Sequence, residues 1–329
     1  MHAELKREIF RIKDEQTFRA AALEVFRFQA ASVPVYRDYL AVLKVEADHL
    51  QEPEQIPFLP IEFFKTHTVI AEGKSAEMVF ESSGTGGMQA SRHHVADLSV
   101  YRESFLRSFH AFHGSPEELC ILALLPSYLE RETSSLVFMM DHLIRWSAHP
   151  ESGFYLDRLG DLAGILKKRN NDGHPTLLLG VSFALLDLAE QYPMELWNNI
   201  MVMETGGMKG RRRELVREEL HQNLKEAFSL EKIHSEYGMT ELLSQAWSQG
   251  DGLFLNPPWM EVLVRDPNDP LSYMDHGKTG GLNIIDLANL YSCSFIATSD
   301  LGRNYEDGSF EVLGRFEQAD IRGCNLLVE

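Results

Sequence analysis

The sequence predicts an α/β fold in which a mostly parallel sheet is flanked by helices and is followed by a small β-rich subdomain. Between residues 97 and 237, short apolar runs alternate with longer helical patterns, which is typical of a parallel sheet with crossover helices. After about residue 250, Pro and Gly separate short strand-like runs. We therefore expect an N-terminal helical segment at 1–50, an α/β core at 51–250, and a β-rich subdomain with a C-terminal tail at 251–329.

The composition limits the classes of partner and compartment. The chain has 329 residues, and its 31 Lys and Arg stand against 49 Asp and Glu, which gives a net charge of −18. Such a charge repels a phosphate backbone, so we expect no nucleic-acid binding. No apolar run approaches the length of a membrane span, and the first residues contain no apolar signal core. Three cysteines are few and odd in number, which favours a reducing cytoplasm over a disulfide scaffold.

The spacing of apolar residues and the breaks at Pro and Gly predict the individual elements. One or two amphipathic helices are expected in residues 1–31 and a short helix in 36–45. Residues 56–65 hold two prolines between apolar residues, so we expect an extended connector packed on a core. The other predicted helices span 97–112, 136–146, 156–166 and 211–228, with one more after 181. The predicted strands span 78–80, 118–125, 176–181, 200–203, 232–234, 259–264, 281–285, 294–298 and 310–313.

The segment from Phe80 to Gln89 leads from an apolar strand into a loop of small residues. Its backbone N–H groups and hydroxyls could hold a phosphate, although a plain surface turn has a similar composition. The loop lacks the Gly-Lys-Ser/Thr ending of a Walker A motif, and it is not the dinucleotide fingerprint. Its candidate phosphate ligands are Ser82, Ser83, Gly84, Thr85, Gly86 and Gly87.

Three predicted strands end in Gly-containing loops, at 82–87, 205–210 and 237–241. Ligands of open α/β sheets bind where the strands end in loops. We therefore expect the three loops to belong to one site.

Further motifs add chemistry to this site. Residues 237–241 are Tyr-Gly-Met-Thr-Glu, residues 298–302 are Thr-Ser-Asp-Leu-Gly, and Gly314 precedes Arg315. Each motif is weak alone, because Tyr237 could be a core tyrosine, Glu241 a charge at a helix N-terminus, and Asp300 a turn residue. Together with the Gly/Ser loop, in this order and spacing, they resemble the ANL superfamily of adenylate-forming enzymes. The expected fold is thus an ANL-type large N-terminal domain.

A closer likeness exists within that superfamily. Residues 56–60, 125–131, 204–207 and 322–324 resemble the acyl-protein synthetases, the fatty-acid-activating subunits of the bacterial luminescence fatty-acid reductase complex. This resemblance covers most of the chain after residue 50. It implies a fatty or other hydrophobic acid as the substrate and a reductase subunit or carrier protein as the acyl acceptor.

The superfamily resemblance implies ATP and Mg²⁺ as cofactors and assigns roles to matching positions. The Gly/Ser loop would hold the leaving pyrophosphate, Tyr237 with Gly238 would face the adenine, and Gly206 and Gly207 would let a strand end lie against the base. Thr240 would bond the α-phosphate, and Glu241 would hold Mg²⁺ through a hard oxygen. Asp300 would accept the ribose hydroxyls, and Arg315 would donate to them.

Two histidines after the loop, His93 and His94, invite a catalytic role. We do not assign one, because the carboxylate nucleophile is already ionised and needs no general base. The chain also departs from the superfamily pattern. Most superfamily loops carry a Lys where this chain has residues 88–90, Met-Gln-Ala, and Arg92 is the nearest cation. The chain ends fifteen residues after Gly314, so we expect the C-terminal lid domain with its catalytic Lys to be absent.

The cysteine near the C-terminus, Cys324, is the expected acyl acceptor, because the resembled synthetases carry the acyl group there as a thioester. Cys293 is a weaker candidate. The predicted function is therefore ATP-dependent formation of an acyl-adenylate, followed by acyl transfer to a protein cysteine. An acyl- or aryl-CoA ligase of reduced architecture and a nucleotide-binding protein that has lost catalysis remain alternatives. The sequence predicts no oligomeric state.

Overall fold

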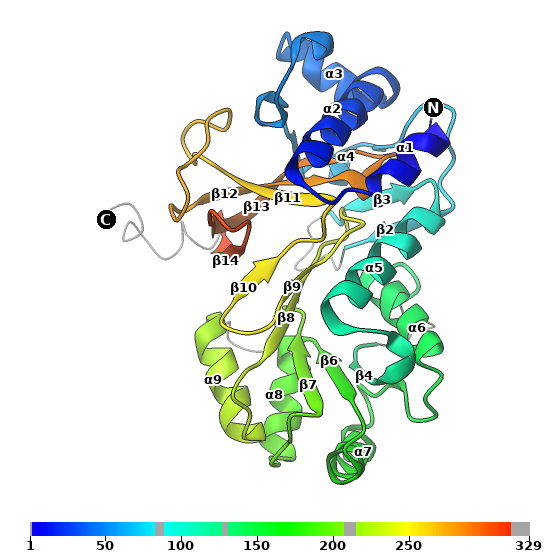
Figure 1. Cartoon of the computed structure of the whole chain (residues 1–329), viewed down its shortest axis with the longest axis vertical. Helices are drawn as coiled ribbons and strands as arrows, with labels where there is room; N and C mark the ends of the chain where they lie inside the picture. Colours follow the sequence, from blue (N-terminus) through cyan, green and yellow to red (C-terminus); the bar gives the residue numbers. More distant parts are fainter. Residues whose placement is uncertain (1, 83–88, 127–130, 207–214, 317–329) are drawn as a thin grey trace.

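The structure is a computed structural model that describes residues 2–82, 89–126, 131–206 and 215–316 (Figure 1). Its α-helices are α1 (His2–Ile9), α2 (Glu15–Ser32), α3 (Pro34–Val42), α4 (Phe63–Thr66), α5 (Leu98–His113), α6 (Ser135–Ser147), α7 (Leu159–Asp172), α8 (Ser182–Gln191) and α9 (Arg217–Phe228). Its strands are β1 (Leu59–Pro60), β2 (Met78–Glu81), β3 (Arg92–Val95), β4 (Cys120–Leu124), β5 (Gly153–Phe154), β6 (Thr176–Gly180), β7 (Ile200–Glu204), β8 (His234–Tyr237), β9 (Ala246–Ser248), β10 (Leu253–Leu255), β11 (Met260–Arg265), β12 (Gly280–Asp286), β13 (Phe295–Asn304) and β14 (Phe310–Arg315).

The parallel half of the main sheet has the order β8-β7-β6-β4-β5, and all its pairs are parallel. Strands β4 and β6 are apolar runs that are buried along their whole length, as expected for strands covered on both faces. Figure 1 shows α8 and α9 on one side of these strands and α5 and α6 on the other. The predicted α/β fold with a mostly parallel sheet flanked by helices is therefore confirmed.

The β-rich section continues the same sheet. The order runs on from β8 through β9, β10, β14, β13 and β12 to β11, and every pair in this half is antiparallel. The section is therefore joined to the parallel strands by ladder hydrogen bonds, and not only packed on them. Strand β8 joins the two halves of the sheet, since it pairs in parallel with β7 and antiparallel with β9.

Two strands differ from their predicted bounds in ways that matter for the site. β8 spans His234–Tyr237, two to three residues later than predicted, because Tyr237 pairs with Ala246 of β9. β13 continues past the predicted end at Thr298, so Asp300 lies inside a strand and not in a turn. A register shift at Leu301 and Gly302 lets β13 keep its pairing with β14.

The N-terminal helices pack on the β-rich section, although the two are far apart in the chain (Figure 1). The buried Gln29 amide of α2 donates to the carbonyls of Asn289 and Leu290, and its oxygen accepts the Ser294 N–H. The predicted connector contributes β1, which pairs in parallel with β13 through Leu59 and Ile296. The N-terminal helices and the β-rich section therefore share one hydrophobic core.

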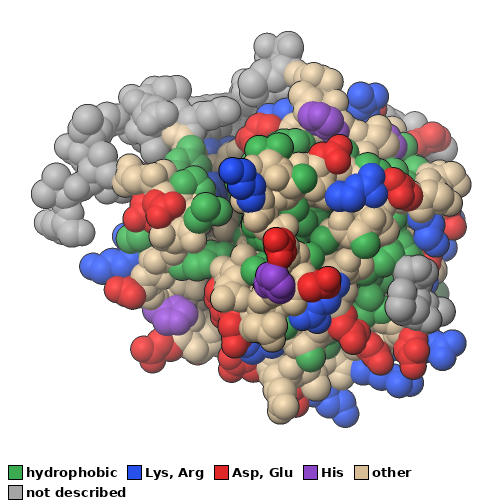
Figure 2. Space-filling model, turned by 90° about the horizontal axis from the view of Figure 1, so that it is seen from above, with side chains coloured by type: hydrophobic (Ala, Val, Ile, Leu, Met, Phe, Trp, Pro, Cys, Tyr) green, Lys and Arg blue, Asp and Glu red, His purple; other side chains and the backbone are tan. Residues whose placement is uncertain are grey.

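Charged side chains of both signs lie on the surface. Figure 2 shows acidic and basic side chains intermingled over the upper face, without one continuous basic patch among its described residues. None of the helices in the described part of the chain is long and apolar enough to cross a membrane.

The close packing at Gly302 of β13 gives a stability prediction. A Cβ built on Gly302 would lie 2.1 Å from the Glu311 carbonyl oxygen and 2.7 Å from Leu282 Cδ2, both held in neighbouring strands. We expect Gly302→Ala to lower the free energy of unfolding in urea by about 1–3 kcal/mol, as overpacking does. Gly164 of α7 is the control, because its added Cβ meets nothing within 4 Å and Ala favours helix. Equal stability of the two variants would contradict the close approach.

Candidate functional site

A hydrogen bond joins the end of β8 to the middle of β13. The Tyr237 hydroxyl donates to Asp300 Oδ2 at 2.8 Å, and Arg315 Nε on β14 donates to Asp300 Oδ1 at 3.3 Å. Tyr237 and Asp300 are buried, whereas the Arg315 side chain is 66% exposed. Three of the predicted nucleotide ligands, from β8, β13 and β14, are thus direct neighbours.

The Tyr237 ring is held by other aromatic rings. Phe254 and Phe310 pack edge-on against it, with centroids 5.8 and 5.5 Å away. Burial and the neighbouring Asp300 carboxylate keep the pKa of Tyr237 well above its usual value, so its hydroxyl stays a donor. The ring has a fixed orientation, and its proposed contact with adenine remains a prediction.

Glu241 lies beside this cluster and is buried, with 5% of its surface exposed. Burial raises the pKa of Glu241, and a hydrogen bond from the Ser91 side chain opposes that shift. The charges of Arg315 and Asp300 also act on the Glu241 carboxyl, so it belongs to the same electrostatic environment as the Tyr237 cluster.

The hairpin of β2 and β3 brings Ser82 to Glu241. The Ser82 N–H donates to the Ser91 carbonyl at 3.0 Å, and the Ser82 hydroxyl accepts the Ser91 N–H at 2.9 Å. Ser91 therefore links the base of the Gly/Ser loop to Glu241, and sequence reasoning missed it because a single serine carries no spacing signal. The other predicted loop ligands lie outside the described residues: Ser83, Gly84, Thr85, Gly86 and Gly87. Arg92, the nearest cation in the sequence, is exposed on β3.

The backbone of the Thr240–Glu241 pair is held by two buried side chains. His93 Nδ1 donates to the Thr240 carbonyl at 2.9 Å, and Asn289 Nδ2 donates to the Glu241 carbonyl at 2.7 Å. Burial lowers the pKa of His93 to about 4, so its ring is neutral near pH 7. His93 thus has a contact to the site without acting as a general base.

Asp286 fixes the residues that follow Glu241. Its fully buried carboxylate accepts the N–H groups of Leu243, Ser244 and Ala288 at 2.7, 3.0 and 3.2 Å, and the Ser244 hydroxyl at 2.6 Å. Burial raises the pKa of Asp286 to about 6 in spite of these donors. The segment after β8 is therefore bound to the end of β12 by one carboxylate.

The end of β7 lies next to the end of β8 in the sheet. Gly206 has a positive φ of 69°, which favours glycine, and its N–H donates to Glu204 Oε2 at 2.6 Å. Burial alone would raise the pKa of Glu204, but hydrogen bonds from His221 and Ser235 and the charge of Arg217 lower it to about 2. Gly207 lies outside the described residues.

Packing explains why residue 238 is a glycine, which the motif alone did not predict. A Cβ there would lie 2.5 Å from Glu236 Oε1, so the Glu236 carboxyl occupies the space beside this residue. Burial and the nearby Glu204 charge raise the pKa of Glu236 to about 8. The Tyr-Gly pair is therefore shaped by a buried carboxyl as well as by any ligand.

Cys120, His149 and Glu151 form a second group that could hold a metal ion. It lies at the start of β4, at the opposite end of the parallel strands. Arg169 already supplies a positive charge there, 3.0 Å from His149 Nε2 and 3.3 Å from Glu151 Oε2. The Arg169 charge disfavours a second cation in this group, and Glu241 as the Mg²⁺ ligand stays a prediction.

Two solved structures share the fold of this chain. An open conformation of 2-hydroxyisobutyryl-CoA ligase, in complex with 2-HIB-AMP and CoA, matches 92% of this chain and 71% of its own, with a TM-score of 0.65 and 12% identity. This likeness shows a shared fold. ATP-bound MatB from Rhodopseudomonas palustris matches 72% of this chain with a TM-score of 0.54 and 15% identity. The chain spans about half the length of MatB, since the match covers 47% of that protein. The ANL-type fold predicted from the motifs is confirmed.

Comparison by sequence adds no closer relative. No family model matches the chain, and no curated protein matches it. At such low identity the structural neighbours establish the fold, and the activity has to be inferred from the residues of the site.

The raised pKa of Glu236 gives a pH prediction. Because its folded-state value of about 8 exceeds the usual 4.5, the folded protein holds this proton more tightly. The resulting stability is present at low pH and is lost as the pH rises through about 8. We expect Glu236→Gln to weaken the fall in Tm between pH 6 and 9 measured by calorimetry. The exposed Glu231→Gln is the control, and parallel curves for Glu236→Gln and the wild type would contradict the burial of this carboxyl.

Proposed function

We propose that this protein uses ATP to activate a carboxylic acid as an acyl-adenylate. The observation that carries the proposal is the cluster at the end of β8, where Tyr237, Asp300 and Arg315 are in contact and Glu241 lies in their field. A nucleotide can be held by a carboxylate and a cation at its ribose hydroxyls, by a flat ring at its base, and by a hard oxygen that binds its metal ion. The cluster offers each of these groups, and the fold is shared with ATP-bound MatB and with a CoA ligase in complex with 2-HIB-AMP.

The proposed step is a substitution at the α-phosphate. A carboxylate oxygen of the acid forms a bond to the α-phosphorus, and the bond from that phosphorus to the bridging oxygen breaks as pyrophosphate leaves with the electron pair. No proton has to be removed from the acid. Asp300 would hold the ribose, and the Thr240 hydroxyl would donate to an α-phosphate oxygen. The acceleration would come from positioning and charge neutralisation.

Mg²⁺ fits the residues around Glu241. This carboxyl is buried, receives a hydrogen bond from Ser91, and forms no ion pair within the described residues. A hard divalent cation would supply the missing positive charge. When bound, Mg²⁺ neutralises phosphate charge in such reactions. Glu241 would hold the ion, and Ser91 would orient the Glu241 carboxyl.

The second half of the proposal is acyl transfer to a protein cysteine. A thiolate would attack the acyl carbon, and the bond from that carbon to the AMP oxygen would break to release AMP. Cys120 and Cys293 are buried, and burial raises the pKa of their thiols to about 11 and about 12. Both thiols are therefore poor nucleophiles near neutral pH. This supports Cys324, which lies outside the described residues, as the acceptor.

The acid is proposed to be fatty or otherwise hydrophobic, and the final acceptor a reductase subunit or carrier protein, both on the resemblance to acyl-protein synthetases. An acyl- or aryl-CoA ligase of reduced architecture is the second candidate. It is favoured by the structural neighbour in complex with CoA.

Pyrophosphate exchange into ATP tests the adenylation step. With a panel of carboxylic acids from short to long chains, we expect exchange that depends on the acid and is greatest for long chains. Glu241→Gln should lower the exchange rate by about 100-fold or more, because it removes the charge that holds Mg²⁺. Glu231→Gln, an exposed change before β8, should leave the rate unchanged. Absence of acid-dependent exchange across the panel would favour a nucleotide-binding protein without catalysis.

Acyl transfer is tested with a radiolabelled acid and ATP. We expect a protein label that hydroxylamine removes and that Cys324→Ser abolishes, while pyrophosphate exchange persists in this variant. A hydroxylamine-sensitive label that survives in Cys324→Ser would overturn the acceptor assignment. Release of the labelled acyl group as acyl-CoA, with no label on protein, would support the CoA-ligase candidate.

A further inference from the structure

The contacts around Thr240 and Glu241 contain an unsatisfied pair of atoms. His93 reaches the Thr240 carbonyl from β3, and Asn289 reaches the Glu241 carbonyl from the 3-10 helix η5 (Leu287–Asn289). Both side chains are fully buried. Yet His93 Nε2 and Asn289 Oδ1, the other polar ends of these side chains, have no hydrogen-bond partner among the described residues.

Hydrogen-bond chemistry fixes the roles of both atoms. A carbonyl oxygen only accepts, so His93 Nδ1 must carry the proton in the bond to Thr240. The neutral ring has one proton, and therefore Nε2 is a bare acceptor. Asn289 donates through its amide nitrogen, so its Oδ1 is also an acceptor. Two acceptors cannot bond each other, and leaving both buried and unpaired is costly.

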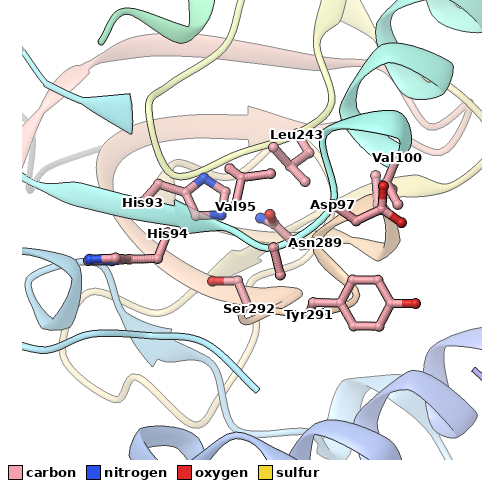
Figure 3. Close-up of a pocket in the computed structure, with 11 residues that line it drawn as sticks. His93, His94, Val95, Asp97, Val100, Leu243, Asn289, Tyr291 and Ser292 are labelled. Atoms are coloured by element: carbon pink, nitrogen blue, oxygen red, sulfur yellow. The ribbon is translucent and has the colours of Figure 1, made fainter. Parts of the chain in front are cut away.

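The two side chains line one small cavity. The volume that the centre of a water-sized sphere can occupy in this cavity is about 10 Å³. This is roughly the room that one water molecule needs. Figure 3 shows the Asn289 side chain beside the His93 ring at this cavity, while the His94 ring points away. Phe64 packs edge-on against the His93 ring and limits its rotation.

We propose that one buried water occupies this cavity and donates its two O–H groups to His93 Nε2 and Asn289 Oδ1. A water molecule is the smallest ligand that supplies two donors to two acceptors. It fixes the Nδ1-protonated tautomer of His93 and the orientation of the Asn289 amide. Each side chain then presents a donor to one carbonyl of the Thr240–Glu241 pair.

The water therefore completes a clamp on the backbone of two residues of the proposed adenylation site. His93 and Asn289 are positioning residues in this assignment, since they act through Thr240 and Glu241. The kinetic consequence rests on the proposed function, whereas the water and the tautomer do not. A structural measurement and a kinetic measurement therefore test them separately.

The structural test uses the wild-type protein. A crystal structure at high resolution is expected to show one density peak within hydrogen-bond distance of both His93 Nε2 and Asn289 Oδ1, which is about 2.7–3.2 Å. In protein labelled with ¹⁵N-histidine at neutral pH, the His93 signals should show a protonated Nδ1 and an unprotonated Nε2. An empty cavity, a peak that contacts only one of the atoms, or a protonated Nε2 would overturn the proposal, whatever the enzyme's activity.

The kinetic test separates positioning from folding. His93→Leu removes the donor to Thr240 and the acceptor for the water, and should lower kcat for pyrophosphate exchange by about 10- to 100-fold, as loss of an orienting contact does. KM for the acid should change by less than about threefold, because the clamp touches no substrate. His93→Asn keeps a donor near the Nδ1 position and should recover part of the rate. His94→Asn is the matched control and should retain wild-type kcat.

These outcomes distinguish the positioning role from a structural one. If His93→Leu lowers Tm but keeps wild-type kcat at 25 °C, His93 is only a core residue and the positioning role is wrong. If the wild type itself shows no exchange, the proposed function fails while the crystal and ¹⁵N results still decide the water site.

Discussion

The Asp286 carboxylate is the contact on which the site depends. It is fully buried and accepts four hydrogen bonds, from the segment after Glu241 and from the turn that follows β12. Removing one partner of such a network leaves buried donors unsatisfied, which costs more than an ordinary hydrogen bond contributes. The network crosses from the parallel half of the sheet to the antiparallel half. It therefore sets where Thr240 and Glu241 stand relative to Asp300.

The site is built from buried carboxyls in an acidic chain. Glu204 has a lowered pKa because His221, Ser235 and Arg217 compensate its burial. Glu236 and Glu241 lack comparable compensation, and their pKa values are raised. Glu204 is thus stabilised in its charged form by protein groups, whereas a bound cation would stabilise the charged forms of Glu236 and Glu241. At Glu241 the proposed Mg²⁺ would supply that charge.

The fold and the grouping of the motifs could be predicted from the sequence for simple reasons. Buried strands such as β4 and β6 are uninterrupted apolar runs, and motifs that follow such strands must meet at one edge of the sheet. Asp300 could be chosen as a site residue from its motif, but its position inside β13 could not be predicted, since it depends on the pairing of β13 with β14.

The residues that support the site could not be predicted in this way. Ser91, His93, Asp286 and Asn289 form no motif, and they act on Thr240 and Glu241 from other parts of the chain. Their roles depend on tertiary contacts that have no local pattern in the sequence.

The central claim is that the Tyr237 cluster and the Thr240–Glu241 pair form an acyl-adenylate site. A crystal structure with a non-hydrolysable acyl-adenylate analogue tests it most directly. We expect both ribose hydroxyls to contact the Asp300 carboxylate and the phosphate mimic to lie within hydrogen-bond distance of the Thr240 hydroxyl. An analogue bound elsewhere, or bound there without touching Asp300 and Thr240, would contradict the claim.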